Sequence, residues 1–74
     1  MNARFIAIFG DTTVKVFRLT GGRQSGNPEP LSHREFERRS AANGLVWKPH
    51  GDRSAVIDLD QFGALIIATR LQLQ

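Results

Sequence analysis

The stretch LSHREF, residues 31–36, carries the signals of a helix start and decides how the rest of the chain is interpreted. The Ser32 hydroxyl can cap the first turn, and Glu35 stands three residues later, where it can reach back to the Ser32 backbone. Leu31 and Phe36 flank that turn and can pack against each other. The sequence therefore predicts a short helix that begins at Ser32.

The end of this helix is marked by Gly44, since glycine adopts the left-handed conformation that often follows a last helical turn. The predicted helix runs from about Ser32 to Asn43. Its apolar side chains are few: Phe36, Ala41 and Ala42. We expect a helix that lies on the surface of a sheet, with most of its circumference in water.

Strands are predicted on both sides of the helix. Arg4–Phe9 and Val14–Leu19 are rich in Phe, Ile and Val, and the short segment Gly10–Thr13 between them is typical of a hairpin loop. The second strand is apolar on both faces, with Val14 and Val16 on one, and Phe17 and Leu19 beside Lys15 on the other. We expect such a strand to be covered on both faces or to need a partner.

After the helix, Leu45–Lys48 predicts a third strand that ends at Pro49, and Ser54–Asp60 alternates as a fourth. Residues 61–74 fit two periodicities. We expect a fifth strand there, with a helix capped by Asp60 as the alternative. The predicted fold class is α+β: a small antiparallel sheet with one surface helix, in the order ββαββ, and a fifth strand or a C-terminal helix at the end.

The length of 74 residues predicts a single domain over residues 1–74. Residues 20–30 contain three glycines and two prolines and are expected to form a flexible loop. The chain has no cysteine, which favours a cytoplasmic location, and no apolar run of the roughly 18 residues that a membrane span needs. We expect no membrane association.

The charge is mildly positive, at +3, and eight of the ten cations are arginines. Arginine suits contacts with carboxylates, phosphates and aromatic rings, so this bias favours a contact surface. Trp47 is interpreted first as a core residue against Phe36 and second as an exposed binding anchor. Within the helix, Glu35–Arg39 and Arg34–Glu37 are predicted as favourable pairs, and the alternative to a contact surface is a salt-bridged, solvated helix face. The predicted partner-binding residues are Arg23, Arg34, Arg38, Arg39 and Trp47.

Catalytic and metal chemistry find little support in the sequence. His33 and His50 lack further ligands at the close spacing of zinc sites, and His33 is expected to bond to Glu37 on the helix. Asp58 and Asp60 share a face of the fourth predicted strand, and alternation explains them better than a catalytic pair. We predict no catalytic residue, no cofactor and no metal site.

A non-enzymatic binding role is therefore the leading hypothesis: stoichiometric docking on a larger protein or nucleoprotein partner, as an inhibitor or adaptor. Short, cysteine-free chains of this kind occur among accessory proteins of phages and mobile elements. The first alternative is nucleic-acid binding through the Arg-rich helix, which the pI near 10.7 permits. The second alternative is a structural subunit that forms a homodimer through its mixed-face strands.

Overall fold

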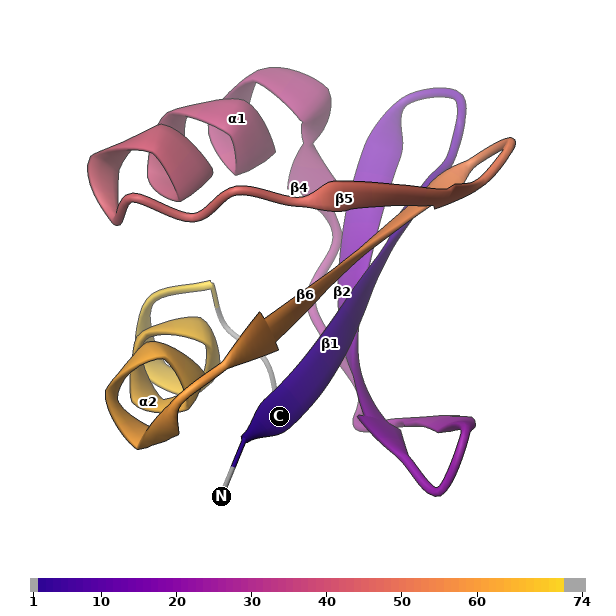
Figure 1. The fold of residues 1–74 in the computed structure, drawn as a ribbon. Helices are drawn as coiled ribbons and strands as arrows, with labels where there is room; N and C mark the ends of the chain where they lie inside the picture. The colour runs from indigo at the N-terminus through magenta and orange to yellow at the C-terminus, as the bar shows by residue number, and fades with distance from the viewer. Residues whose placement is uncertain (1, 72–74) are drawn as a thin grey trace.

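The computed structural model describes residues 2–71, which form an antiparallel six-stranded sheet and two helices (Figure 1). The α+β class and the expected ββαββ core of the element order are confirmed, with two further short strands and a helix at the end. In chain order the elements are β1 (Ala3–Phe9), β2 (Thr13–Thr20), β3 (Arg23–Ser25), β4 (Leu31–Ser32), α1 (His33–Ala42), β5 (Lys48–Gly51), β6 (Ser54–Leu59) and α2 (Gln61–Arg70).

Strand β1 is the centre of the sheet, whose order is β3-β2-β1-β6-β5. The predicted hairpin is confirmed, because β1 pairs with β2 from Arg4–Leu19 to Phe9–Val14. On its other side β1 pairs with β6. Strands β3 and β4 share the outer edge of β2: β3 pairs with its last three residues and β4 with its first two.

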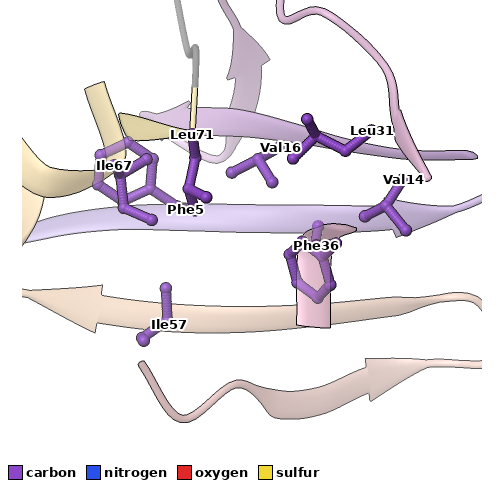
Figure 2. Packing of buried hydrophobic residues seen from close by; sticks show 9 residues of the cluster. Phe5, Val14, Val16, Leu31, Phe36, Ile57, Ile67 and Leu71 are labelled. Atoms are coloured by element: carbon purple, nitrogen blue, oxygen red, sulfur yellow. The ribbon is translucent and has the colours of Figure 1, made fainter. Parts of the chain in front are cut away.

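The core lies between one face of the sheet and the two helices, which both pack on the same side (Figure 1). Alternate residues of β1, β2 and β6 point to that side, and Phe5, Ala7 and Val16 are at most 1% exposed. Figure 2 shows how the helices complete the cluster, with Phe36 from α1 and Ile67 from α2. The labelled members of this core are Phe5, Val14, Val16, Leu31, Phe36, Ile57, Ile67 and Leu71.

Helix α1 begins and ends as predicted. The Ser32 side chain accepts a hydrogen bond from the Glu35 amide at 3.1 Å, and Leu31 and Phe36 are both buried in the core. Asn43 is the C-cap, and Gly44 follows with a φ of 66°. The reciprocal half of the capping box was expected, but the Glu35 carboxylate bonds forward to arginines of its own helix.

Residues 61–70 form a helix, so the expectation of a fifth strand there is wrong and its alternative is confirmed. Asp60 caps α2 by accepting a hydrogen bond from the Gly63 amide at 2.8 Å. Gly63 lets the helix approach β6 closely, because a Cβ at that position would lie 3.0 Å from the Leu59 side chain. Ile67 and Leu71 stand four residues apart, so the helical conformation places both on the side that is buried against the sheet. Leu73, which we also placed in that strand, lies outside the described residues.

Two other boundaries differ from the prediction. The third predicted strand, Leu45–Lys48, is displaced: β5 begins at Lys48 and continues through Pro49 to Gly51, with a bulge. Leu45 and Trp47, which precede Lys48, instead pack against the core. The expected loop at residues 20–30 contains the three-residue strand β3. Pro28, which follows β3 in the same segment, is buried.

Candidate functional site

Two of the three arginines of α1, Arg38 and Arg39, form ion pairs with Glu35 of the same helix. Arg38 holds both carboxylate oxygens of Glu35, with its Nε 3.0 Å from Oε2, and Arg39 Nε donates to Oε1 at 2.6 Å. Hydrogen bonds from Arg38 first, and from Arg39 second, lower the pKa of Glu35 from 4.5 to about 2. Arg39 also donates to the Arg70 carbonyl oxygen at 3.0 Å and so links α1 to α2. The predicted Glu35–Arg39 pair is confirmed.

The remaining predicted arginines do not join this cluster. Arg34 is exposed and, within residues 2–71, makes neither the expected pair with Glu37 nor any other ion pair. Arg23 lies on β3, which pairs with the last residues of β2, whereas β4 leads into α1 from the first residues of β2. The length of β2 therefore separates Arg23 from α1, and the four arginines do not form one surface.

Trp47 is a half-buried residue of the core side, which confirms the first interpretation. Its ring packs against Phe36 with 5.3 Å between ring centroids, and its Nε1 donates to Ser40 Oγ at 3.0 Å. Ser40 is buried, so this bond satisfies a polar group beneath the indole. Trp47 fixes the segment after α1 against the helix.

His33, Asp58 and Asp60 each have a structural role. The His33 ring stacks on Phe9, and its Nε2 donates to the Gly10 carbonyl oxygen at 2.8 Å, so the expected bond to Glu37 is wrong. Asp58 pairs with Arg4 at 3.4 Å. Asp60 is the cap of α2 and leaves the strand, so it shares no strand face with Asp58. Among residues 2–71, no three His, Asp or Glu side chains gather in a way that would hold a metal ion.

A second surface is the sheet face opposite the helices, which we call the outer face. Strand register places apolar side chains of three strands in one row across its middle: Val56 beside Ile6, and Ile6 beside Phe17. Ile8 and Leu19 extend the row on either side, and no helix of the described chain covers it (Figure 1). Ile6 and Val56 at its centre are nevertheless buried, at 6% and 8% exposed, and Ile8, Phe17 and Leu19 are half-buried. The outer-face residues are Arg4, Ile6, Ile8, Lys15, Phe17, Leu19, Lys48, Val56 and Asp58.

The charge on the outer face is positive. Three cations, Arg4, Lys15 and Lys48, surround the apolar row, and Asp58 is the single anion of the set. Because Asp58 is paired with Arg4, the charges of Lys15 and Lys48 remain available: neither forms an ion pair within residues 2–71. The outer face thus combines an apolar centre with a cationic rim.

Two hollows open on this face. The larger, of about 400 Å³, lies over β1, β2 and β3 and is lined by Ile8, Gly10, Thr13, Lys15, Phe17 and Gln24. The smaller, of about 230 Å³, lies over β1, β6 and β5 and is lined by Arg4, Val46, Lys48, Val56, Ile57 and Asp58. Each hollow combines apolar walls with at least one cation, and the exposed Val46 stands at the rim of the second.

Three of the nine outer-face residues are predicted together from the sequence: Lys15, Phe17 and Leu19 lie on one face of a strand, and this face is not cleanly polar. The sequence does not connect them to Ile6 or to Val56, because that connection depends on the register of three strands. The signal that could complete the set is the unbroken apolar run at residues 5–9, and a second apolar run at residues 55–57, because each places apolar side chains on both faces of its strand.

Comparison of the chain with protein-family models, with curated proteins and with solved structures found no match. Neither helix in the described part of the chain has the length and apolar character required to cross a membrane.

Proposed function

We propose that this protein is a small, non-enzymatic binding protein that docks stoichiometrically on a larger protein through its outer face. The observation that supports this proposal is a row of apolar side chains from three strands, on a face that neither helix covers. Three cations, Arg4, Lys15 and Lys48, lie next to this row. Ile8, Phe17 and Leu19 leave partly exposed apolar surface together on this face, and clustered apolar surface on a small domain is typical of an interaction site. Docking there would serve an inhibitor or an adaptor, and we expect it to take place in the cytosol.

The chemistry of the outer face indicates what the partner presents. Lys15 stands beside the larger hollow and Lys48 beside the smaller, so each hollow suits an apolar side chain with a carboxylate next to it. Apolar contact at the centre would supply most of the affinity, and charge pairs at the rim would supply orientation and association rate. We therefore propose a partner surface with apolar groups at its centre and Asp or Glu around them.

Nucleic-acid binding through the Arg-rich helix, the first alternative, has weaker support. Glu35 neutralises part of the arginine cluster, since it holds Arg38 and Arg39 in hydrogen bonds. Arg34 remains as an exposed, unpaired cation of α1 within the described chain, and Arg23 is distant from it. A single unpaired arginine on the helix would neutralise few phosphates, so its contribution to nucleic-acid affinity would be small.

Two double variants with the same change in net charge test the proposal. Lys15→Glu with Lys48→Glu reverses the charge of the outer face, and Arg23→Glu with Arg34→Glu reverses two exposed arginines elsewhere. Wild type and both variants would serve as bait in cell extract, with captured proteins identified by mass spectrometry and binding then measured by calorimetry. We expect the outer-face variant to lose affinity about tenfold or more, and the arginine variant to bind as the wild type does.

The opposite pattern, in which the arginine variant loses the partner and the lysine variant keeps it, would contradict the proposal. Retention of nucleic acid alone, with an affinity that falls steeply as salt rises, would favour the first alternative instead. Circular dichroism of both variants controls for folding. The four substituted side chains are exposed, so the fold should be retained.

A further inference from the structure

Helix α2 carries a second apolar surface that the proposed function does not use. Phe62 is 79% exposed and Leu65 is 60% exposed, although both are large apolar side chains. They stand three residues apart on the helix and therefore lie on one side of it, with half-buried Ile66 beside them and Thr69 one turn beyond Leu65. We call these four residues the α2 stripe.

The α2 stripe points away from the molecule's own core. Gly63, Ile67 and Leu71 form the opposite side of the helix, where Gly63 lies against Leu59 and the other two are buried. The outer face belongs to the other side of the sheet, since both helices pack on the core side (Figure 1). A partner on the α2 stripe would therefore leave the outer face free.

We infer that the α2 stripe binds the α2 stripe of a second copy of this chain, with the two helices antiparallel about a twofold axis near Leu65. Residues 61–69 contain no charged side chain, so a second copy meets no like-charge repulsion along the stripe. The two ends differ in sign, and each lies five residues from Leu65: Asp60 caps the N-terminus through the Gly63 amide, and Arg70 in the last turn donates to Asn43 Oδ1 at 3.1 Å. Both side chains are exposed and neither forms an ion pair within residues 2–71, so both charges remain unneutralised. Antiparallel pairing places the Asp60 end of one copy beside the Arg70 end of the other, twice.

A dimer formed through the strands is less favourable than one formed through the α2 stripe. Two outer faces brought together would gather the unpaired Lys15 and Lys48 of both copies in one interface, and an excess of like charge there is unfavourable. The α2 stripe is neutral and self-complementary, which a twofold interface requires. A second copy of the chain carries the same α2 stripe and so presents a surface that matches it.

The dimer should be weak. A ten-residue helix is about 15 Å long, and two such helices bury less than the roughly 1,200 Å² of a standard stable interface. We expect a dissociation constant on the order of 100 micromolar, and hence a monomer–dimer equilibrium that concentration controls.

Sedimentation equilibrium from about 10 micromolar to about 1 millimolar tests this inference, because the mean mass should rise toward that of two copies across this range. Leu65→Gln should keep the chain monomeric throughout. Val46→Gln is the matched control: Val46 is 77% exposed but lies outside α2, and this substitution should leave the equilibrium unchanged. A wild type that stays monomeric, or a dimer lost in Val46→Gln and kept in Leu65→Gln, overturns the inference.

Cross-linking gives a second measurement that does not depend on a loss of association. The chain has no cysteine, so a single substitution provides the only thiol. With a twofold axis near Leu65, Leu65→Cys should form a disulfide between two copies under mild oxidation, and Val46→Cys should remain largely reduced. Equal yields of cross-linked dimer from the two variants would show random collision and reject the arrangement.

Discussion

Phe36 joins helix α1 to the rest of the protein, so its substitution gives the sharpest test of the fold. Its side chain is 5% exposed and contacts two other rings, Phe9 at 5.6 Å and Trp47 at 5.3 Å between centroids. Phe36→Leu keeps an apolar side chain of similar volume and removes both aromatic contacts. Each such contact contributes about 0.5–1.5 kcal/mol, so we expect a loss of about 2 kcal/mol in the free energy of unfolding.

The loss can be followed directly, because Trp47 is the single tryptophan and packs on the substituted residue. With a urea m value of about 1 kcal/mol/M for a domain of this size, the unfolding midpoint should fall by about 2 M. Phe62→Leu is the control: Phe62 is 79% exposed, and its change should stay within about 0.5 kcal/mol. If both variants unfold at the same urea concentration, Phe36 does not anchor α1 and our account of the core is refuted.

Three further predictions concern the helices. Ser32→Ala removes the cap of α1 and should cost about 1 kcal/mol in a thermal melt, whereas Ser32→Asp should retain most of the stability. Gly63→Ala places a Cβ 3.0 Å from Leu59, so it should lower the melting temperature even though alanine favours helices; unchanged stability would contradict the close approach of α2 to β6. The pKa of Glu35 is about 2 in the folded chain and ordinarily 4.5, so its ionised form stabilises the fold above pH 4.5 and this contribution is lost as the pH falls toward 2. Carbon-detected NMR titration should show the low pKa, and Glu35→Gln should lose less stability over that range than the wild type does.

The parts of the fold that local residues determine were predicted correctly. The α1 boundaries depend on Ser32 and on the backbone conformation of Gly44, and both are local properties of the sequence. The β1–β2 hairpin depends on two β-favouring segments and a short loop. In each case one segment of the chain contains all the information.

The remaining elements depend on contacts between distant segments. Residues 61–70 are apolar enough to fit a strand or a helix, and the outcome depends on burying Ile67 and Leu71 against the sheet. Strand β3 contains three polar residues and owes its conformation to pairing with the end of β2. The outer face could not be predicted because its row crosses β6, β1 and β2, and so requires their register. The arginine group was overestimated, since Glu35 accepts from two of its members.

The edge strand β5 has a consequence for the behaviour of the protein in concentrated solution. Its four residues include Pro49, which has no amide hydrogen to donate, and the strand is bulged between Pro49 and Gly51. The far edge of β2 is divided between two short strands. Neither edge of the sheet presents a long, regular row of unpaired backbone groups to which a strand of another chain could add. The molecule can therefore carry partly exposed apolar side chains on its outer face without a strand edge that favours amyloid-like stacking.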